Sequence, residues 1–366
     1  MGVSSKINYL ASNNFVVNIC GTRDSAPQMD SVTQIVLGAA IGEAFLGTKE
    51  GRKGAIWGAI LGTIPDLDVA IGFFVDPVTQ LAVHRSGSHS ILIALLAAPL
   101  IGSLLKRVHP KSKTSKMDWI AMTFFVFFTH IGIDICTVYG TQVFWPLSDY
   151  PYSFDNIFII DPFYTLPLAI GVTTALLVKR SSRWRFGANL AGLLISSFYL
   201  TWSASAKLIA QGSFRQGLAS KGFQVEKVMS APTPLNTFLW MGMGLHQDTI
   251  RVGLYSVLDK RPPTGFYSVP RNSYLLNGHQ DDIAIRRLMW FSKGWYAVEE
   301  DSLGLVYSDY RFGRNDAWLS DAGKPVFNFR LIPDSAGAFV SFQQEMPSLG
   351  QPIETLKLVF ERAKGN

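Results

Sequence analysis

Histidine and aspartate residues occur in the first half of this 366-residue chain at spacings that suit metal ligation. His130 and Asp134, in the stretch FFTHIGID, are four residues apart, so a helix places the imidazole and the carboxylate on one face. His84 and His89 stand in the heptad HRSGSHS, directly before an apolar run. Imidazole and carboxylate ligands without thiolates favour Zn²⁺, with Mn²⁺ or Fe²⁺ as alternatives. Such an ion lowers the pKa of bound water and polarises an ester, which is the chemistry of hydrolysis.

Three further aspartates lie close to apolar runs. Asp66 and Asp68, in TIPDLDV, cannot share a face of a regular helix, but Pro65 disturbs the backbone and both can turn inward beyond it. Asp161 opens the stretch DPFYTLP. Taken alone, an Asp-x-Asp pair is also typical of an ordinary turn at a helix end. The complete set of predicted metal ligands is Asp66, Asp68, His84, His89, His130 and Asp134.

Arg85 and a carboxylate that is not a ligand would complete a hydrolytic site. The guanidinium of Arg85 is a planar bidentate donor that suits an anionic substrate group such as phosphate. Asp68 or Asp161 would serve as the general base. Ser90 is predicted to be a loop or N-cap hydroxyl, because no nucleophilic triad is visible. The predicted catalytic residues are therefore Asp68, Asp161 and Arg85.

The elements that carry these residues are predicted to be membrane helices. Apolar residues make up 48% of the chain and charged residues only 16%, which is low for a soluble protein. Six apolar stretches approach the length that crosses a hydrocarbon core of about 30 Å. They are residues 32–47, 54–75, 91–105, 118–138, 162–178 and 186–208. The alternative, six helices buried in a large soluble protein, is disfavoured because so few charges accompany them.

Basic residues in the short loops predict the orientation of this bundle. Lys and Arg cluster in every second loop, whereas the loops 76–90 and 139–161 contain only Arg85 between them. Positive loops mark the cytoplasmic side, so these two loops and all candidate ligands are predicted near the outer face. The net charge of +6 is then a matter of topology and of attraction to anionic membrane lipids. No nucleic-acid partner is expected.

The character of the chain changes after about residue 210. Stretches such as TFLWMGMGL, TIRVGLYSVL, GWYAVEE and LGLVYSDYRFG place aromatic and β-branched residues between Gly, Asp and Asn, which predicts strands and turns. We therefore expect a mainly α membrane bundle over residues 29–210 and a β-rich (α+β) soluble domain over residues 211–366 on the outer side. Residues 1–28 lack the apolar core of a signal peptide and are predicted to be a disordered extension.

Several motifs, in order from Met29, resemble a known family. MDSVTQIVLGAAIGEAFLG, WGAILGTIPDLD, HRSGSHS, FFTHIGIDICTVYGTQVFWP and IFIIDPFYTLP are similar to the predicted membrane-bound metal-dependent hydrolases related to the LexA-regulated inner-membrane family. WFSKGWY and YRFG are similar to its longer members. The resemblance implies a multi-pass bacterial inner-membrane protein with a metal centre. More distant similarity to zinc-dependent phospholipase C proteins suggests phosphoester hydrolysis. The family's site pieces fall on Asp66, Asp68, His84, Arg85, His89, Ser90, His130, Asp134 and Asp161.

Two positions in the first apolar run bear on activity. The family has Thr-His where this chain has Thr33 and Gln34, and an amide is a far poorer metal ligand than imidazole. Glu43 also matches the family pattern, but it lies nine residues after Gln34 and therefore on the opposite face of a continuous helix. We expect Glu43 to support the site indirectly or to lie at a packing interface.

Three functions remain open at this point. The main prediction is a metal-dependent hydrolase that acts at the outer membrane face on a small or lipid-linked ester. A transport protein would pass a metal ion or a proton through the same groups, but it should continue the polar groups to the cytoplasmic side, where only Glu43 interrupts the apolar helices. A catalytically silent membrane protein is the third, and Gln34 favours it.

Overall fold

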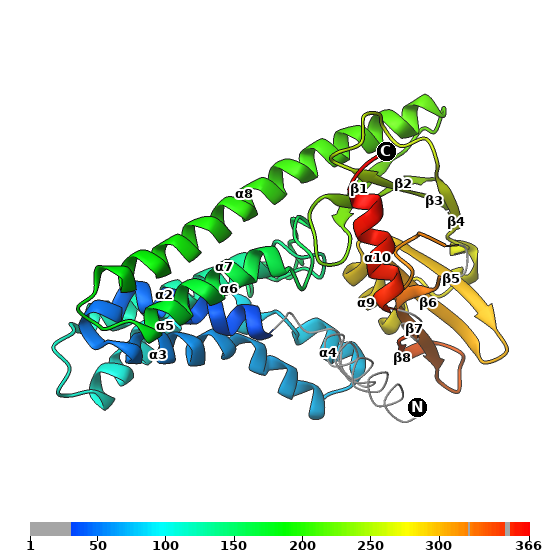
Figure 1. Ribbon diagram of the computed structural model, residues 1–366. Coiled ribbons are helices and arrows are strands. Elements are labelled where there is room, and N and C mark those ends of the chain that lie inside the picture. Colours follow the sequence, from blue (N-terminus) through cyan, green and yellow to red (C-terminus); the bar gives the residue numbers. More distant parts are fainter. Residues whose placement is uncertain (1–30, 321–322, 348–351) are drawn as a thin grey trace, which may run out of the picture.

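The computed structural model describes residues 31–320, 323–347 and 352–366. The predicted disordered extension, residues 1–28, lies outside these. A helical first half is followed by two antiparallel sheets, which confirms the expected order of an α bundle and a β-rich domain (Figure 1). The helices of the first half are α2 (Ser31–Glu50), α3 (Arg52–Thr63), η1 (Pro65–Phe73), α4 (Pro77–Val83), η2 (Gly87–His89), α5 (Ile91–Val108), α6 (Lys116–Asp134), α7 (Pro162–Leu177) and α8 (Arg183–Ser220).

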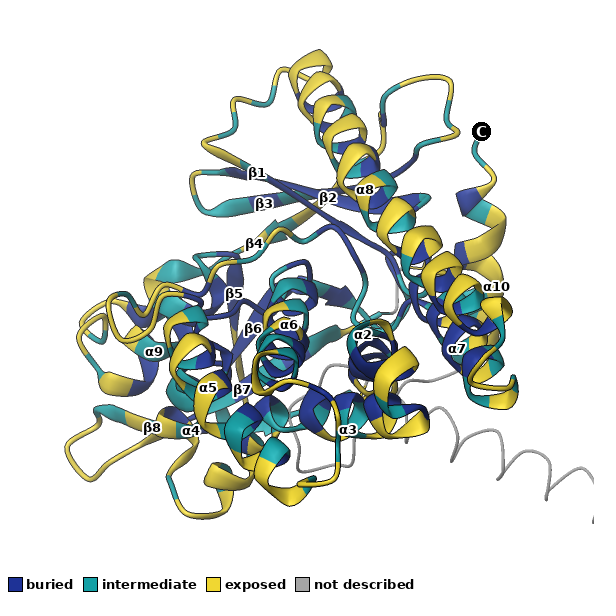
Figure 2. Cartoon of the chain, turned by 90° about the vertical axis from the view of Figure 1, so that its left-hand side faces the viewer, coloured by how far each residue is buried: buried dark blue, intermediate teal, exposed yellow. Residues whose placement is uncertain are grey.

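The apolar helices correspond to the six predicted runs. Five segments of the described chain are long and apolar enough to cross a membrane: Ser31–Glu50, Arg52–Phe73, Ile91–Val108, Lys116–Asp134 and Arg183–Ser220. α7 is apolar but shorter, with 16 residues. Their outer faces carry exposed large side chains such as Leu100, Leu104, Ile170 and Phe198, and Figure 2 shows these exposed faces around the bundle. An apolar exterior of this kind is what a lipid environment requires.

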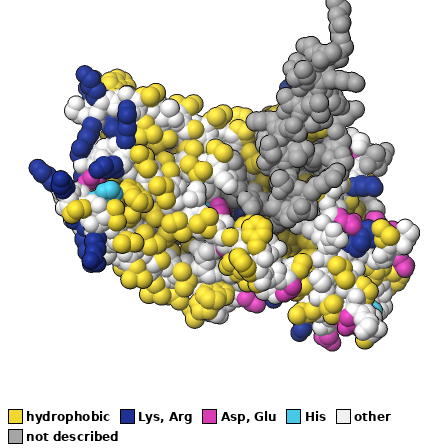
Figure 3. Space-filling model, turned by 90° about the horizontal axis from the view of Figure 1, so that it is seen from below, with side chains coloured by type: hydrophobic (Ala, Val, Ile, Leu, Met, Phe, Trp, Pro, Cys, Tyr) yellow, Lys and Arg dark blue, Asp and Glu magenta, His cyan; other side chains and the backbone are white. Residues whose placement is uncertain are grey.

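Charge divides the two ends of the bundle. Lys and Arg side chains gather at the end that carries the loops between α2 and α3, α5 and α6, and α7 and α8 (Figure 3). Contacts such as Lys49 with Asp118 and Arg180 with the Thr48 carbonyl hold these loops together. The two sheets lie at the opposite end (Figure 1). The C-terminal domain therefore lies at the end of the bundle whose loops, residues 76–90 and 139–161, contain only one basic residue, Arg85.

The second predicted helix, residues 54–75, is interrupted. α3 ends at Thr63, and a 3-10 helix, η1, begins at Pro65. Proline has no N–H to donate and its ring clashes with the carbonyl four residues back, so a regular α-helix does not continue through it. The change of winding redirects Asp66 and Asp68, which both lie on η1.

α8 is much longer than the predicted run and passes through the predicted domain boundary at residue 210. Its 38 residues span about 57 Å, well beyond the membrane core. The projecting part packs against the first sheet, where Ala206, Ala210 and Phe214 contact Trp240 and Tyr255. One continuous helix thus connects the membrane bundle to the C-terminal domain.

The C-terminal domain contains two four-stranded antiparallel sheets, each in sequential order. The first has β1 (Lys227–Pro232), β2 (Leu239–His246), β3 (Thr249–Ser256) and β4 (Tyr267–Pro270). The second has β5 (Tyr296–Asp301), β6 (Gly304–Arg314), β7 (Pro325–Pro333) and β8 (Phe339–Glu345), and the remaining helices are η3 (Ser273–Leu276), α9 (Ile283–Ser292) and α10 (Pro352–Ala363). The four stretches singled out in the sequence form β2, β3, β5 and β6.

α2 and α3 are packed backbone against backbone. A Cβ atom added at Gly58 would overlap the Gly38 carbonyl, and one added at Gly42 would lie 2.9 Å from the Cα of Gly58. Small residues allow such close approach. In lipid, burial of apolar side chains does not drive helices together, so close van der Waals packing of this kind holds α2 against α3.

We expect Gly58→Val to destabilise the bundle by at least the 1–3 kcal/mol or so typical of overpacking, because the new side chain must separate the two backbones. Gly132→Ala in α6 is the matched control, since nothing lies within 4 Å of a Cβ at that position. Thermal unfolding of the detergent-purified protein measures both variants. Equal melting temperatures would contradict the close packing of α2 and α3.

Candidate metal centre

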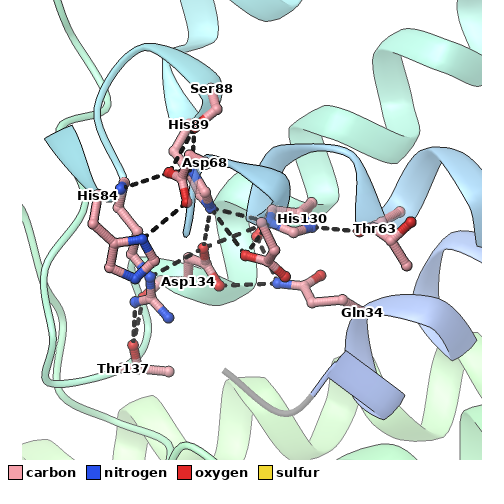
Figure 4. A network of polar contacts seen from close by, with 12 residues as sticks. Gln34, Thr63, Asp68, His84, Ser88, His89, His130, Asp134 and Thr137 are labelled. Carbon is pink, nitrogen blue, oxygen red and sulfur yellow. Dashed lines mark hydrogen bonds and ion pairs between the residues drawn. The ribbon is translucent and has the colours of Figure 1, made fainter. Parts of the chain in front are cut away.

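Four of the six predicted ligands meet at one point near the end of the bundle that faces the sheets. Asp66 comes from η1, His89 from η2, and His130 and Asp134 from consecutive turns of α6. One ligand atom from each lies within 4.8 Å of the other three. Figure 4 shows His89, His130 and Asp134 turned toward one another. This group of four residues could hold a metal ion.

The separations between the ligand atoms suit a small divalent ion. His89 Nε2 lies 3.2 Å from His130 Nε2, 3.0 Å from Asp134 Oδ2 and 3.4 Å from Asp66 Oδ1. His130 Nε2 lies 3.5 Å from Asp66 Oδ1 and 3.7 Å from Asp134 Oδ2. Two tetrahedral ligands of Zn²⁺ at the usual bond lengths are about 3.3 Å apart. These five distances scatter around that value.

Hydrogen bonds fix the tautomer of both histidines. His130 Nδ1 lies 2.8 Å from the Gly62 carbonyl, which can only accept, so Nδ1 carries the proton. The Ser88 hydroxyl donates to Asp68 Oδ2 and must therefore accept from His89 Nδ1, 2.9 Å away. In the neutral form of each ring the lone pair is then at Nε2, and the two Nε2 atoms lie 3.2 Å apart, where a cation between them would accept both.

Asp68 lies beside the four-residue group and organises the heptad. Its Oδ2 accepts from the backbone N–H of Arg85 at 2.9 Å and from Ser88, and its Oδ1 lies 2.9 Å from His84 Nδ1. The same Oδ2 is 3.4 Å from His89 Nδ1. A carboxylate on the far nitrogen of a ligating histidine orients the ring and raises its basicity. The structure therefore places Asp68 and His84 as neighbours of the group and not within it.

Arg85 is almost fully buried and lacks a full set of partners. Its Nε lies 3.6 Å from Asp134 Oδ2, and its Nη1 donates to Thr137 Oγ1 at 3.2 Å. Its Nε and Nη2 have no hydrogen-bond partner within the described part of the chain, and neither has Asp134 Oδ2. Arg85 also has a positive φ of 55°, which is unusual for a residue with a side chain. An anionic group would accept hydrogen bonds from the two Arg85 nitrogens, and a cation would bind the Asp134 oxygen.

A divalent cation would balance the charges of this region. Asp66, Asp68 and Asp134 carry three negative charges and the Arg85 guanidinium, which lies beside Asp134, carries one positive charge, so two negative charges remain when the histidines are neutral. Uncompensated charges are costly in a buried site. The donor set and the charge therefore both fit a divalent ion.

Gln34 lies in the site despite the loss of an imidazole. Its Nε2 donates to Asp134 Oδ1 at 2.9 Å, and its Oε1 has no hydrogen-bond partner among the described residues. Figure 4 places Gln34 on the opposite side of Asp134 from His84. Gln34, where the resemblance implies a histidine, thus holds Asp134 through its amide.

The other predicted residues lie outside the group. Asp161 caps α7 through the N–H of Phe163 and accepts from Tyr199 at 2.8 Å, while burial raises its pKa to about 6. Glu43 forms a buried bidentate pair with Arg185 at 2.6 and 2.7 Å, so it is a packing-interface residue. Ser90 caps α5 and donates to the Trp145 carbonyl, as expected of an N-cap hydroxyl.

Three contributors were missed by sequence reasoning. Thr137 and Tyr139 contact Arg85, and the Gly62 carbonyl fixes His130. A backbone carbonyl has no residue-type signal, and a threonine or tyrosine beyond a helix end is common. Only their nearness to the ligands in the sequence could have indicated Thr137 and Tyr139.

We expect the full-length protein, purified in detergent, to hold about one equivalent of divalent metal per chain, and both His130→Ala and Asp134→Ala to lose it because each removes a ligand. His246→Ala, at the end of β2 and away from the group, is the control and should keep the metal. Elemental analysis of the three variants measures this. Metal retained in both ligand variants, or absent from the unaltered protein, would exclude the site.

Comparison with known proteins gives one match. Residues 29–210 match the family described as YdjM inner membrane protein. No curated protein and no solved structure matches the chain. The matched region begins at Met29 and contains all four residues of the candidate metal centre. Over its helical half, the chain is therefore similar to the YdjM inner membrane protein family.

Proposed function

We propose that this protein is a metal-dependent hydrolase of the inner membrane that acts on a lipid or lipid-linked ester. The observation that carries the proposal is the convergence of Asp66, His89, His130 and Asp134, with the two histidine Nε2 atoms 3.2 Å apart. Zn²⁺ is the ion that this donor set suits best. When bound, a divalent ion polarises an ester oxygen and generates a nucleophile from water near neutral pH.

The residues around the group have separate tasks in this proposal. Arg85 binds an anionic part of the substrate through Nε and Nη2, which have no hydrogen-bond partner in the described residues. Of the two carboxylates considered as the general base, only Asp68 contacts the group, and because it does so at His89 Nδ1, its task here is to orient that ring and raise its basicity. Asp68 also holds His84 and the heptad in place.

A lipid-linked substrate is supported by the surroundings of Asp66. Its side chain is 19% exposed, whereas those of His89, His130 and Asp134 are at most 1% exposed, so the group opens on the η1 side. Exposed apolar side chains occupy the same 3-10 helix and its end: Leu67, Ile71, Phe73 and Phe74. An apolar chain would lie along these residues while the ester reaches the metal.

With the basic loops on the cytoplasmic side, as we propose, the site and the C-terminal domain would lie outside the cytoplasm. Transport is the weaker interpretation, because Glu43, the ionisable residue that interrupts the apolar helices toward the basic end, is neutralised by Arg185. A catalytically silent protein is the second candidate. Gln34 favours it, since its amide engages Asp134 where the family has an imidazole.

We expect the metal-loaded protein to hydrolyse model p-nitrophenyl esters, with long-chain esters preferred over short ones, and to lose the activity with EDTA. Arg85→Gln should raise KM for bis-p-nitrophenyl phosphate about tenfold or more through the lost charge-assisted hydrogen bonds, and leave KM for a neutral carboxylic ester unchanged. His246→Ala is again the control. Metal-loaded protein that turns over neither ester class would refute the hydrolase and favour the silent protein.

Gln34→His tests whether the amide weakens an active centre. An imidazole at this position adds a ligand near Asp134, so we expect tighter Zn²⁺ binding, by about tenfold, measured by competition with a chelating dye. Gln34→Asn, which keeps an amide, is the control. An unchanged affinity in Gln34→His would show that the position is not part of the ligand sphere.

A further inference from the structure

The His84–Arg85 turn is held from two sides by the C-terminal domain. The turn follows directly after α4, and α4 places Val78 and Leu81 in the hydrophobic core of the second sheet, with Leu288, Phe329 and Phe342. This core belongs to the C-terminal domain, although α4 lies in the membrane half of the sequence. The position of α4, and with it the start of the heptad, therefore depends on the sheet.

Tyr139 supports the turn from the other side. The His84 ring meets its edge with centroids 5.1 Å apart, and the Arg85 guanidinium lies 4.8 Å from the centre of its ring. The tyrosine is 3% exposed and packs with Phe291 of α9 at 5.0 Å. One aromatic ring thus lies between the two site residues and the core of the C-terminal domain. A cation–π contact is stronger at a buried arginine than at an exposed one, because water does not screen it.

The segment that carries Tyr139 is itself tied to the C-terminal domain by polar contacts. Arg311, paired with Asp309 in a fully buried position, donates to the Val138 carbonyl at 3.1 Å. Trp290 donates to the Asp149 carbonyl at 3.1 Å, and Lys293 donates to Ser153 at 2.6 Å. The C-terminal domain is therefore joined to the first half of the chain by the segment 138–153 as well as by the long helix α8.

We propose that Tyr139 is a positioning residue through which the C-terminal domain holds the His84–Arg85 turn beside the metal centre. The domain is then part of the support of the site and not an independent module. This inference rests on the proposed function in one respect: it takes the candidate metal centre to be the functional site. The strained backbone of Arg85, with φ 55°, requires such external support, because αL geometry is unfavourable for a residue with a side chain.

Hydrogen exchange of the full-length protein in detergent tests the proposal without a bound metal or a substrate. The amides of His84, Arg85, Ser86, His89 and Ser90 all donate within the protein. Tyr139→Leu should accelerate their exchange about tenfold. Tyr139→Phe keeps the ring and should exchange at the rate of the unaltered protein.

Phe327→Leu is the matched control for the loss of an aromatic ring from the same core. Phe327 is 1% exposed and stacks on Phe312 at 3.9 Å, and it has no ring contact with His84 or Arg85 in the described structure. It should lower the melting temperature and leave the exchange of residues 84–90 unchanged. Should Tyr139→Leu fail to fold, Phe291→Leu removes the packing behind Tyr139 and should accelerate the same amides.

Exchange of residues 84–90 that is unchanged in Tyr139→Leu, or equally faster in Phe327→Leu, would overturn the proposal. For Phe291→Leu, exchange no faster than in Phe327→Leu would do the same. The exchange result does not depend on the proposed function. If the unaltered protein held no metal and hydrolysed no ester, the hydrolase would be refuted, but the exchange rates would still test the role of Tyr139.

Discussion

A carboxylate buried at the edge of a membrane must have its charge met by donors, and Asp68 meets this requirement by gathering the heptad around itself. The Arg85 amide, the Ser88 hydroxyl and the His84 ring all contact its two oxygens. Since the same side chain also faces His89 Nδ1, one carboxylate determines the path of the loop and the direction of the Nε2 that faces the centre. The arrangement of the candidate metal centre depends on this contact.

The helices beneath the site supply the complementary constraint. Backbone contact between α2 and α3 sets the position of Gly62, whose carbonyl orients His130 on α6. The amide of Gln34 on α2 reaches Asp134 on the same helix α6. Close glycine packing and ligand orientation are thus connected, because the residues that allow the backbones to approach also place an acceptor at the ligand.

The buried carboxylates at the two ends of the bundle have different numbers of basic partners. The charge of Glu43 is compensated by the bidentate contact with Arg185. Asn189, one turn after Arg185 on α8, donates to the Ala40 carbonyl, so these contacts join α2 to α8. At the other end three carboxylates have one arginine, and the excess negative charge is what a divalent ion would balance. The difference separates a structural ion pair from a binding site.

The sequence by itself determined the apolar helices, the β-rich second half and the set of chemically important residues, because periodicity, loop charge and residue type are local properties. It also indicated that His130 and Asp134 share a face, since both lie on one helix. Only the tertiary structure decided that Asp66 enters the group while Asp68 and His84 stay beside it, that Asp161 caps α7 away from it, and that Tyr139 links the site to the second sheet. These outcomes arise from contacts between segments far apart in the chain, and the direction of a side chain after a proline break is set by the partners it meets there.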